Sequence, residues 1–462
     1  MQFSGLPFLF CFLPAMILIY LLTPKKMKNA ALFLGSILFY AWGEKRLVFL
    51  FLLAILLNYL FGLWIGRCRE SGKGNVLLWI AVAGDLGMLF YFKYADFFIG
   101  SFNRLFRTSV SLLKVALPLG ISFYTFQMIS YLADVYRGSV KPQRNLITFG
   151  TYVALFPQLI AGPIVRYAQL EDQLEHRTHS LEKVADGARR FVVGLGKKVL
   201  IANAMGEVCT RFRATGDASV LFYWMYAVAF MLQIYFDFSG YSDMAIGLGK
   251  LFGFELPENF DYPYISGSIT EFWRRWHMSL GGWFRDYVYI PLGGNRKGQK
   301  RQFFNILIVW ALTGLWHGAS WNFVLWGIFF AILLIVEKLG FLQWLKKHPA
   351  AGHFYVLLFV LLGFVLFNAA DFAQLGQDLA GMFGLLSIPP VSVEAVYVLR
   401  SYGILFVMGC VGATPLAKVL AEKICERRGL GWLEPAFLCG IFLLVTSYLV
   451  AGSFQPFLYF RF

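Results

Sequence analysis

Apolar segments of nearly bilayer-spanning length recur along the whole chain, and they limit the folds that it can adopt. The clearest are at residues 6–22, 47–65, 76–92, 222–236, 303–316, 322–336, 354–367, 402–411 and 435–450. A helix of about 20 apolar residues crosses the hydrocarbon core of a membrane. Together with shorter or interrupted segments, the pattern predicts an all-α polytopic membrane protein with roughly 10–12 transmembrane or re-entrant helices.

The composition favours one integral membrane domain over a soluble domain with an anchor. Of the 462 residues, 58% are hydrophobic and 15% are charged, whereas soluble domains contain about 45–50% apolar and about 25% charged residues. We therefore predict a single domain over residues 1–462 with three zones. These are N-terminal helices at 1–115, a core at 115–340 that glycine, proline and charge interrupt more often, and C-terminal helices at 340–462.

The net charge of +15 does not indicate nucleic-acid binding, because the basic residues mostly lie between apolar segments. Cytosolic loops and anionic headgroups explain that distribution. The first segment does not resemble a signal peptide, and the lysines that follow it predict an N-terminus outside the cytoplasm. The six cysteines form no C-x-x-C pair, so we expect free thiols and no metal site.

A histidine follows one of the most apolar runs of the chain. The run at 303–316 leads directly to His317, and apolar residues resume after Ser320. An ionisable ring near bilayer depth is costly without a partner or a watered cavity, so it indicates a functional site. Burial favours the neutral imidazole, which can take a proton from a hydroxyl. The alternative is an interior histidine that a carbonyl or a neighbouring helix satisfies.

A second histidine, His277, lies in a stretch at 262–301 that is too polar for a simple span and rich in aromatic residues. Trp and Tyr favour the boundary between water and lipid, so we expect interfacial or re-entrant helices at the cytosolic mouth of a cavity. The neighbouring Arg274 and Arg275 could bind phosphate, with snorkelling to headgroups as the alternative. His277 could equally be an interfacial histidine without a chemical role.

Two carboxylates, Asp237 and Asp243, fall in a largely apolar stretch. Their spacing of six does not fit the i,i+3 or i,i+4 contacts of a helix, so we do not expect them to act as a pair. One of them is expected to hold a histidine or an arginine, and the other to be structural. The glycine turn at 291–296, which ends in Asn295 and Arg296, could bind an anion through backbone amides.

Four long blocks together resemble the membrane-bound O-acyltransferase family. Within it they are most similar to the bacterial alginate and polysaccharide O-acetyltransferase type and its peptidoglycan relatives. The blocks lie between residues 155 and 330 and read LFPQLIAGPIVR, YFDFSGYSDMAIGLGKLFGFELPENFDYPY, SITEFWRRWHMSLGGWFRDYVYIPLGGNRKG and LTGLWHGASWNFVLWG. The resemblance implies helices around a central tunnel that joins the two membrane faces, with the catalytic core at 115–340.

The resemblance also assigns roles to the two histidines. The invariant histidine of the family falls on His317, and a second conserved polar position falls on His277. We expect His317 to act as the general base and His277 to orient the thioester or stabilise the oxyanion. The predicted donor-binding residues are Trp273, Arg274, Arg275, Trp276, Arg285, Asn295 and Arg296, and the predicted supporting residues are Asp237, Asp243, Asn259 and Trp316.

The implied reaction is acetyl transfer to a hydroxyl of alginate, another exopolysaccharide or peptidoglycan. The expected donor is cytosolic acetyl-CoA, a substrate, and no bound cofactor is expected. The resemblance implies a separate extracytoplasmic acetyltransferase as partner, and the lack of a G-x-S-x-G motif agrees with it. The expected location is the inner (cytoplasmic) membrane of a bacterial cell, in contact with lipid. Three rivals stay open: a D-alanyl transferase for teichoic acid, a transporter or flippase without covalent chemistry, and a purely structural membrane scaffold.

Overall fold

The computed structural model is built from helices. It describes residues 2–426, 430–452 and 456–458, and no β-strand forms within them. In that part of the chain, seven helical segments are long and apolar enough to cross a membrane: Leu47–Ser71, Lys73–Phe106, Val220–Leu251, Trp321–Lys347, Pro349–Asn368, Val393–Gly412 and Leu433–Val450. The predicted all-α membrane fold is confirmed. The additional passes or half-passes and the central tunnel stay predictions.

The chain forms two compact units. Unit 1 comprises Met1–Phe191 and Met244–Glu258, and unit 2 comprises Val192–Asp243 and Asn259–Phe462. Two of the three boundaries fall within helices α10 (Leu181–Gly196) and α12 (Val220–Leu251), so each of these helices contributes residues to both units, and the third lies in the irregular segment after α12. The sequence-based division into one domain with three zones stays a prediction.

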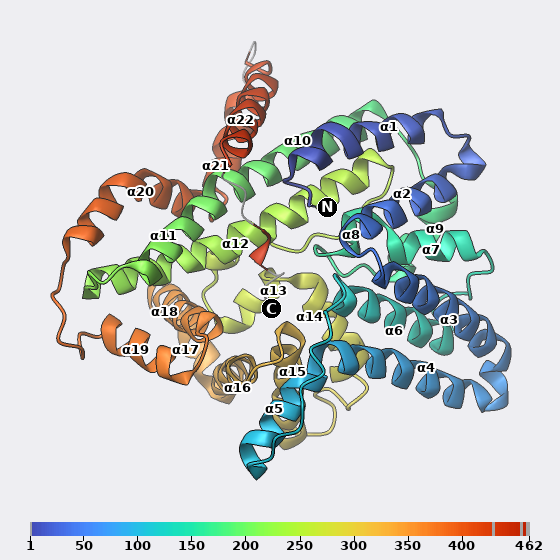
Figure 1. Cartoon of the computed structure of the whole chain (residues 1–462), viewed down its shortest axis with the longest axis horizontal. Coiled ribbons are helices and arrows are strands. Elements are labelled where there is room, and N and C mark those ends of the chain that lie inside the picture. Colours follow the sequence, from blue (N-terminus) through green and yellow to red (C-terminus); the bar gives the residue numbers. More distant parts are fainter. Residues whose placement is uncertain (1, 427–429, 453–455, 459–462) are drawn as a thin grey trace. The chain divides into compact units, whose positions relative to one another are not determined.

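Unit 1 contains the N-terminal helices. They are α1 (Leu13–Leu22), α2 (Lys28–Gly43), α3 (Leu47–Cys68), α4 (Lys73–Leu89), α5 (Ala95–Phe106), α6 (Ile121–Arg137), α7 (Leu146–Ala154), α8 (Phe156–Leu159) and α9 (Tyr167–His176). Helices α3, α4 and α6 lie side by side (Figure 1). The Asn58 amide on α3 donates to the Asp85 carboxylate on α4 at 2.8 Å. Buried polar groups need such partners, so this bond fixes the two helices to each other.

Glycine and proline interrupt the helical pattern in LIAGPIVR, which lies in the zone at 115–340 where the sequence predicts such interruptions. The chain between α8 and α9 is irregular and almost entirely buried. The Tyr152 hydroxyl donates to the carbonyl of Val165 at 3.1 Å, and the Gln158 amide donates to the carbonyl of Tyr152 at 2.7 Å. Irregular backbone at membrane depth is tolerated where protein or water satisfies it, and these side chains supply part of that need.

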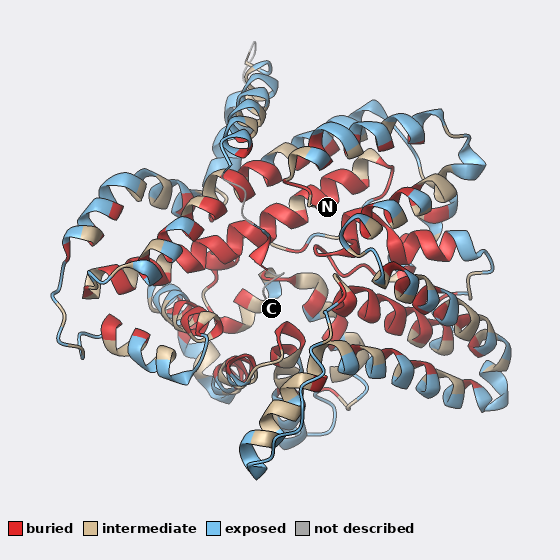
Figure 2. Cartoon of the chain, in the orientation of Figure 1, coloured by how far each residue is buried: buried red, intermediate tan, exposed pale blue. Residues whose placement is uncertain are grey.

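Unit 2 contains parts of α10 and α12 and, besides them, α11 (Asn203–Ala214), α13 (Ile269–Arg275), α14 (Met278–Phe284), α15 (Gln299–His317), α16 (Trp321–Val336), α17 (Leu342–Lys347), α18 (Pro349–Asn368), α19 (Phe372–Met382), α20 (Val393–Gly412), α21 (Leu416–Cys425) and α22 (Leu433–Val450). The predicted site residues all lie in this unit. Figure 2 shows α12 buried along most of its length, whereas α20 and α22 are largely exposed. The apolar surfaces of α20 and α22 are thus available to lipid.

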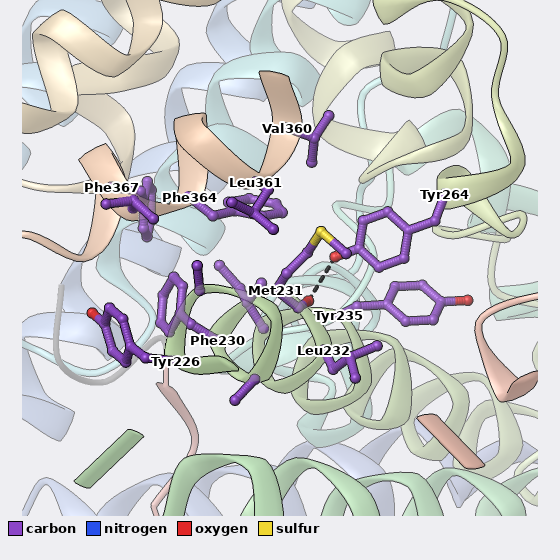
Figure 3. Close-up of a cluster of buried hydrophobic side chains, with 14 of the residues drawn as sticks. Tyr226, Phe230, Met231, Leu232, Tyr235, Tyr264, Val360, Leu361, Phe364 and Phe367 are labelled. Atoms are coloured by element: carbon purple, nitrogen blue, oxygen red, sulfur yellow. Dashed lines mark hydrogen bonds between the residues drawn. The ribbon is translucent and has the colours of Figure 1, made fainter. Parts of the chain in front are cut away.

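A cluster of buried aromatic and aliphatic side chains joins α12 to α18 (Figure 3). Phe230 and Met231 on α12 belong to the same core as Leu361 and Phe364 on α18. The Tyr264 hydroxyl donates to the main-chain carbonyl of Met231 at 2.6 Å, which satisfies the one polar group that this ring brings into the core. Through Tyr264, this cluster anchors the segment that leads into α13.

Helices α15 and α16 form a tight hairpin around a turn at 318–320. Their backbones touch where a side chain is absent: a Cβ atom on Gly327 would overlap the carbonyl oxygen of Trp310, and one on Gly314 would overlap that of Phe323. Small residues allow helices to approach this closely. Because His317 is the last residue of α15, the crossing determines where its ring lies.

We expect Gly327→Ala to destabilise unit 2 by about 1–3 kcal/mol, because the added methyl group must push the two helices apart. The control is Gly403→Ala on α20, where a Cβ atom meets nothing within 4 Å. Alanine there should be neutral or stabilising by up to about 1 kcal/mol. Thermal unfolding of the detergent-purified variants measures both. A Gly327→Ala protein as stable as Gly403→Ala would show that the hairpin tolerates separation.

Candidate active site

His277 lies at the junction between α13 and α14 and is 2% exposed. Its φ of +45° is in the left-handed region, which few residues other than glycine adopt. The N–H of the next residue, Met278, donates to the main-chain carbonyl of Asn259 at 3.0 Å. Imidazole Nδ1 lies 3.0 Å from Oδ1 of the same asparagine. Asn259, a predicted supporting residue, therefore holds both the backbone and the ring of this junction.

The second ring nitrogen of His277, Nε2, is buried and has no hydrogen-bond partner within the described residues. Three aromatic rings lie around the imidazole, with distances between ring centroids of 4.6 Å to Phe238, 6.5 Å to Phe260 and 5.8 Å to Trp316. Burial lowers the pKa of His277 from its ordinary value of 6.5 to about 3. The imidazole is therefore neutral at physiological pH, the form that offers a lone pair to a substrate.

His317 is 6% exposed at the C-terminal end of α15. Its imidazole contacts the rings of Trp316, Trp326 and Phe367, with centroid distances of 5.1, 5.1 and 5.4 Å. The C-terminal end of a helix carries partial negative charge, which stabilises a protonated histidine by roughly 0.3–2 kcal/mol. His317 thus lies where the helix assists the uptake of a proton.

One indole contacts both imidazoles. The ring of Trp316 lies 5.8 Å from that of His277 and 5.1 Å from that of His317, between centroids. Three residues that the sequence analysis selected, two as catalytic and one as supporting, are therefore brought together inside unit 2. They come from α15 and from the junction before α14, which are 40 residues apart in the chain.

The tryptophans predicted for donor binding belong to the core of unit 2. Trp273 packs on Trp310 and Phe330 at 4.6 and 4.9 Å between ring centroids, and Trp276 packs on Phe364 at 5.3 Å. We expected them at an open interfacial mouth. Because Trp273 and Trp276 are three residues apart, the helical turn points both toward the core. Core packing accounts for both residues, and their part in donor binding stays a prediction.

The predicted donor-binding arginines differ in their partners. Arg275 forms an ion pair with Asp261 at 2.8 Å, and Arg285 forms one with Asp286 at 2.6 Å. Arg274 is exposed on α13. A guanidinium group that already binds a carboxylate is less available to a phosphate, so Arg274 is the best placed of the three for that role.

The predicted glycine turn is present before α15. Gly293 and Gly294 have φ values of +104° and +55°, conformations that glycine adopts without strain. Asn305 of α15 donates to the carbonyl of Gly294 at 2.9 Å and so ties the turn to the helix. Asn295 and Arg296 are exposed in this turn, and their binding of an anion stays a prediction.

Asp237 and Asp243 on α12 form ion pairs with consecutive lysines. Lys198 Nζ lies 2.5 Å from Asp237 Oδ1, with side chains only 6% and 2% exposed, and Lys197 Nζ lies 2.7 Å from Asp243 Oδ2. The sequence analysis expected a histidine or an arginine as partner for one of them, whereas the ion partners that the structure shows are lysines. A buried carboxylate needs a cation at its own depth, and the chain that follows α10 supplies two.

Asp237 also binds the last residues that the structure describes. Its Oδ2 accepts a hydrogen bond from the main-chain N–H of Leu458 at 2.7 Å. The neighbouring Phe457 packs on Phe238, with 5.9 Å between ring centroids. Because Phe238 in turn contacts His277, this C-terminal segment is one side chain away from the candidate active site.

Two further residues, which the sequence analysis did not single out, help to hold the site. Buried Glu337, directly after α16, accepts the backbone N–H groups of Ile269 and Thr270 at 2.6 and 2.9 Å and so caps α13. Ser279 donates from Oγ to Asn259 Oδ1 at 2.8 Å. The position of Glu337 at the end of an apolar run could have indicated a buried carboxylate. Nothing in the sequence distinguishes Ser279 from other serines.

The fold and the site together define a class of protein: a multipass helical membrane protein with two buried histidines in one unit. A family model described as MBOAT, membrane-bound O-acyltransferase family, matches residues 140–370, a range that includes every predicted site residue. The chain belongs to this family and is a membrane-bound acyltransferase. The resemblance inferred from the four sequence blocks is confirmed.

The relatives cover the chain to different extents. The "probable alginate O-acetylase AlgI" of Pseudomonas putida is 39% identical over 100% of both chains. A peptidoglycan O-acetyltransferase of Helicobacter pylori is 31% identical, covering 98% of this chain and 96% of the relative. A teichoic acid D-alanyltransferase of Bacillus subtilis is 30% identical, covering 55% of this chain and 69% of the relative.

Proposed function

We propose that this enzyme takes an acetyl group from cytosolic acetyl-CoA and passes it across the membrane for O-acetylation of an extracytoplasmic polysaccharide. The observation that carries the proposal is the pair of buried imidazoles that both contact one indole, that of Trp316, in unit 2. The choice of acetyl is supported by relatives named as acetylating enzymes, which match nearly the whole chain, whereas the D-alanyl-transferring relative matches 55% of it.

In this proposal His317 is the general base. It takes the proton of the acceptor hydroxyl while the hydroxyl oxygen bonds to the thioester carbonyl carbon. The carbon–sulfur bond then breaks, and the departing thiolate of CoA takes the proton from His317. The leaving thiol has a pKa near 8.5, so it departs readily. A second route, through an acetyl group carried on His317, gives the same products.

The proposal also accounts for the use of a membrane enzyme. CoA is large and highly charged and does not cross lipid, so handing over only the acetyl group moves the chemistry without moving the carrier. Exposed Arg274, together with Asn295 and Arg296 in the turn before α15, would bind the phosphates of CoA. A separate acetyltransferase outside the cytoplasm would complete the transfer to alginate, another exopolysaccharide or peptidoglycan. The enzyme would reside in the inner membrane of a bacterial cell.

The test of this function is a comparison of donors. The purified full-length protein in proteoliposomes, with alginate oligosaccharides as hydroxyl acceptor on the opposite side of the membrane, receives acetyl-CoA with a labelled acetyl group, or a labelled D-alanyl carrier protein. We expect release of free CoA from the first and no consumption of the second. Consumption of the D-alanyl carrier alone would assign the enzyme to D-alanyl transfer. Movement of label across the membrane with neither thioester cleaved would make the protein a transporter.

A further inference from the structure

His277 combines three features that are costly in a folded protein. Its backbone is left-handed, its ring is buried, and its Nε2 is without a hydrogen-bond partner within the described residues. Left-handed backbone in a residue other than glycine is strained. A buried acceptor without a donor adds the cost of its lost hydration. Such unfavourable features concentrate at functional sites. The contacts that hold His277 in this conformation therefore indicate how the ring is used.

The contacts of Asn259 establish which of its side-chain atoms faces His277. The main-chain N–H of Ser279, which can only donate, lies 3.2 Å from that atom. The atom is therefore the amide oxygen. The amide nitrogen faces the opposite way and donates to Ser242 Oγ at 3.1 Å. This assignment rests on a backbone donor: interchanging the two amide atoms would set the amide N–H groups against the N–H of Ser279, and that hydrogen bond would be lost.

The same oxygen determines the protonation of the imidazole. Oδ1 of Asn259 lies 3.0 Å from Nδ1 of His277 and can only accept a hydrogen bond. Nδ1 must therefore carry the ring proton, because two lone pairs at that distance would repel each other. In the neutral ring the lone pair is then on Nε2, which is buried and has no hydrogen-bond partner within the described residues.

We propose that Asn259 is a positioning residue that holds His277 in the Nδ1–H form, so that its bare Nε2 accepts a hydrogen bond from a hydroxyl or amide N–H of a substrate. The proposal rests on the acyl transfer described above and deepens it. A bare lone pair cannot donate to an oxyanion. His277 is therefore an acceptor toward substrate, in place of the oxyanion-stabilising role considered from the sequence.

Among the side chains around the His277 ring, Asn259 is the group that determines which ring nitrogen carries the proton. The side chains that face the imidazole are Phe238 from α12, Asn259 and Phe260 from the segment before α13, Ser279 from α14, and Trp316 from α15. None of these side chains is charged, and none titrates near neutral pH. A change at Asn259 should therefore alter the ring directly, both in its tautomer and in its affinity for a proton.

The direct test measures the tautomer and needs no turnover. The full-length protein is labelled with ¹⁵N in its histidine rings, and the His277 signals are assigned by their loss in His277→Gln. At neutral pH we expect Nδ1 to appear as a protonated nitrogen and Nε2 as an unprotonated one. Asn259→Leu removes the acceptor and should move the ring toward the Nε2–H form. A wild-type ring protonated on Nε2 would overturn the proposal.

The kinetic test uses two substitutions of similar size. Asn259→Leu should lower kcat for CoA release from acetyl-CoA by roughly 10–100-fold, the usual loss when a group that orients a functional histidine is removed. Asn259→Asp keeps the accepting oxygen and adds a negative charge, which raises the affinity of His277 for a proton. We expect the low-pH limb of kcat/KM to move upward by one pH unit or more. A merely structural role would lower turnover in both variants without moving the pH dependence.

The control is Ser242→Ala, which removes the bond at the far end of the Asn259 amide and leaves its oxygen on His277. Its pH dependence should match that of the wild type. The two proposals fail in different ways. If the wild type releases no CoA, the proposed function fails, and the NMR measurement still judges the tautomer. If the wild type turns over but both Asn259 variants keep its pH dependence, the positioning role alone is wrong.

Discussion

Replacement of His317 by alanine should reduce the release of CoA from acetyl-CoA by about 10²–10⁴-fold, the usual contribution of a general base. The substitution removes the imidazole at the end of α15, where the helix favours uptake of a proton. Because Ala is a good helix former, the last turn of α15 should persist. The measurement is the initial rate of thiol release by the purified protein at saturating acetyl-CoA, in the presence of the same hydroxyl acceptor as in the comparison of donors.

The matched control for His317→Ala is His348→Ala. His348 is also in unit 2, but it is exposed and stacks on Trp344, with 4.5 Å between ring centroids. We expect its rate of CoA release to equal that of the wild type. A folded His317→Ala protein with wild-type turnover would contradict the assignment of the base and would leave His277 as the imidazole to test next.

Replacement of Asp237 by alanine should cost about 3–5 kcal/mol of stability, since it leaves the Lys198 ammonium buried without its counter-ion. It also removes the acceptor of the Leu458 N–H. We therefore expect little folded protein. The measurement is the fraction of the detergent-purified protein that stays monodisperse after heating. Asp243→Ala is the control: its ion pair with Lys197 is more exposed, so the expected loss is about 1 kcal/mol or less.

A double variant separates the charge from the hydrogen bond. Lys198→Met with Asp237→Asn removes both charges and keeps an oxygen for the N–H of Leu458. Replacement of a whole buried pair by neutral groups is often tolerated, so this protein should recover most of the wild-type stability. If it is as unstable as Asp237→Ala, the ion pair itself is required, and the unpaired lysine is not the cause of the loss.

The membrane fold and the two histidines could be predicted because their signals are local. The length of an apolar run can be read from neighbouring residues, and the ring of His317 is conspicuous because it follows such a run. The signal for the helical break in LIAGPIVR is also local, because a glycine and a proline within a few residues are enough to interrupt a helix.

The parts that could not be predicted depend on segments that are distant in the chain. The lysine partner of Asp237 and the cap that Glu337 places on α13 join residues 39 and 67–68 positions apart. Trp273 and Trp276 were expected at a lipid boundary because indoles favour it. An indole in a protein core has the same sequence signal, and only the packing on Trp310 and Phe364 distinguishes the two cases.

The hydrogen bond between Asp237 and Leu458 has a consequence for biogenesis. The two residues are 221 positions apart, a stretch that a ribosome needs roughly 10–40 s to translate at about 5–20 residues per second. While the nascent chain grows, the second carboxylate oxygen of Asp237 lacks this backbone partner, and Phe238 lacks its cover by Phe457. The contacts of Phe457 and Leu458 beside His277 thus form only after translation has passed Leu458, when helices α13 to α22 have already been synthesised.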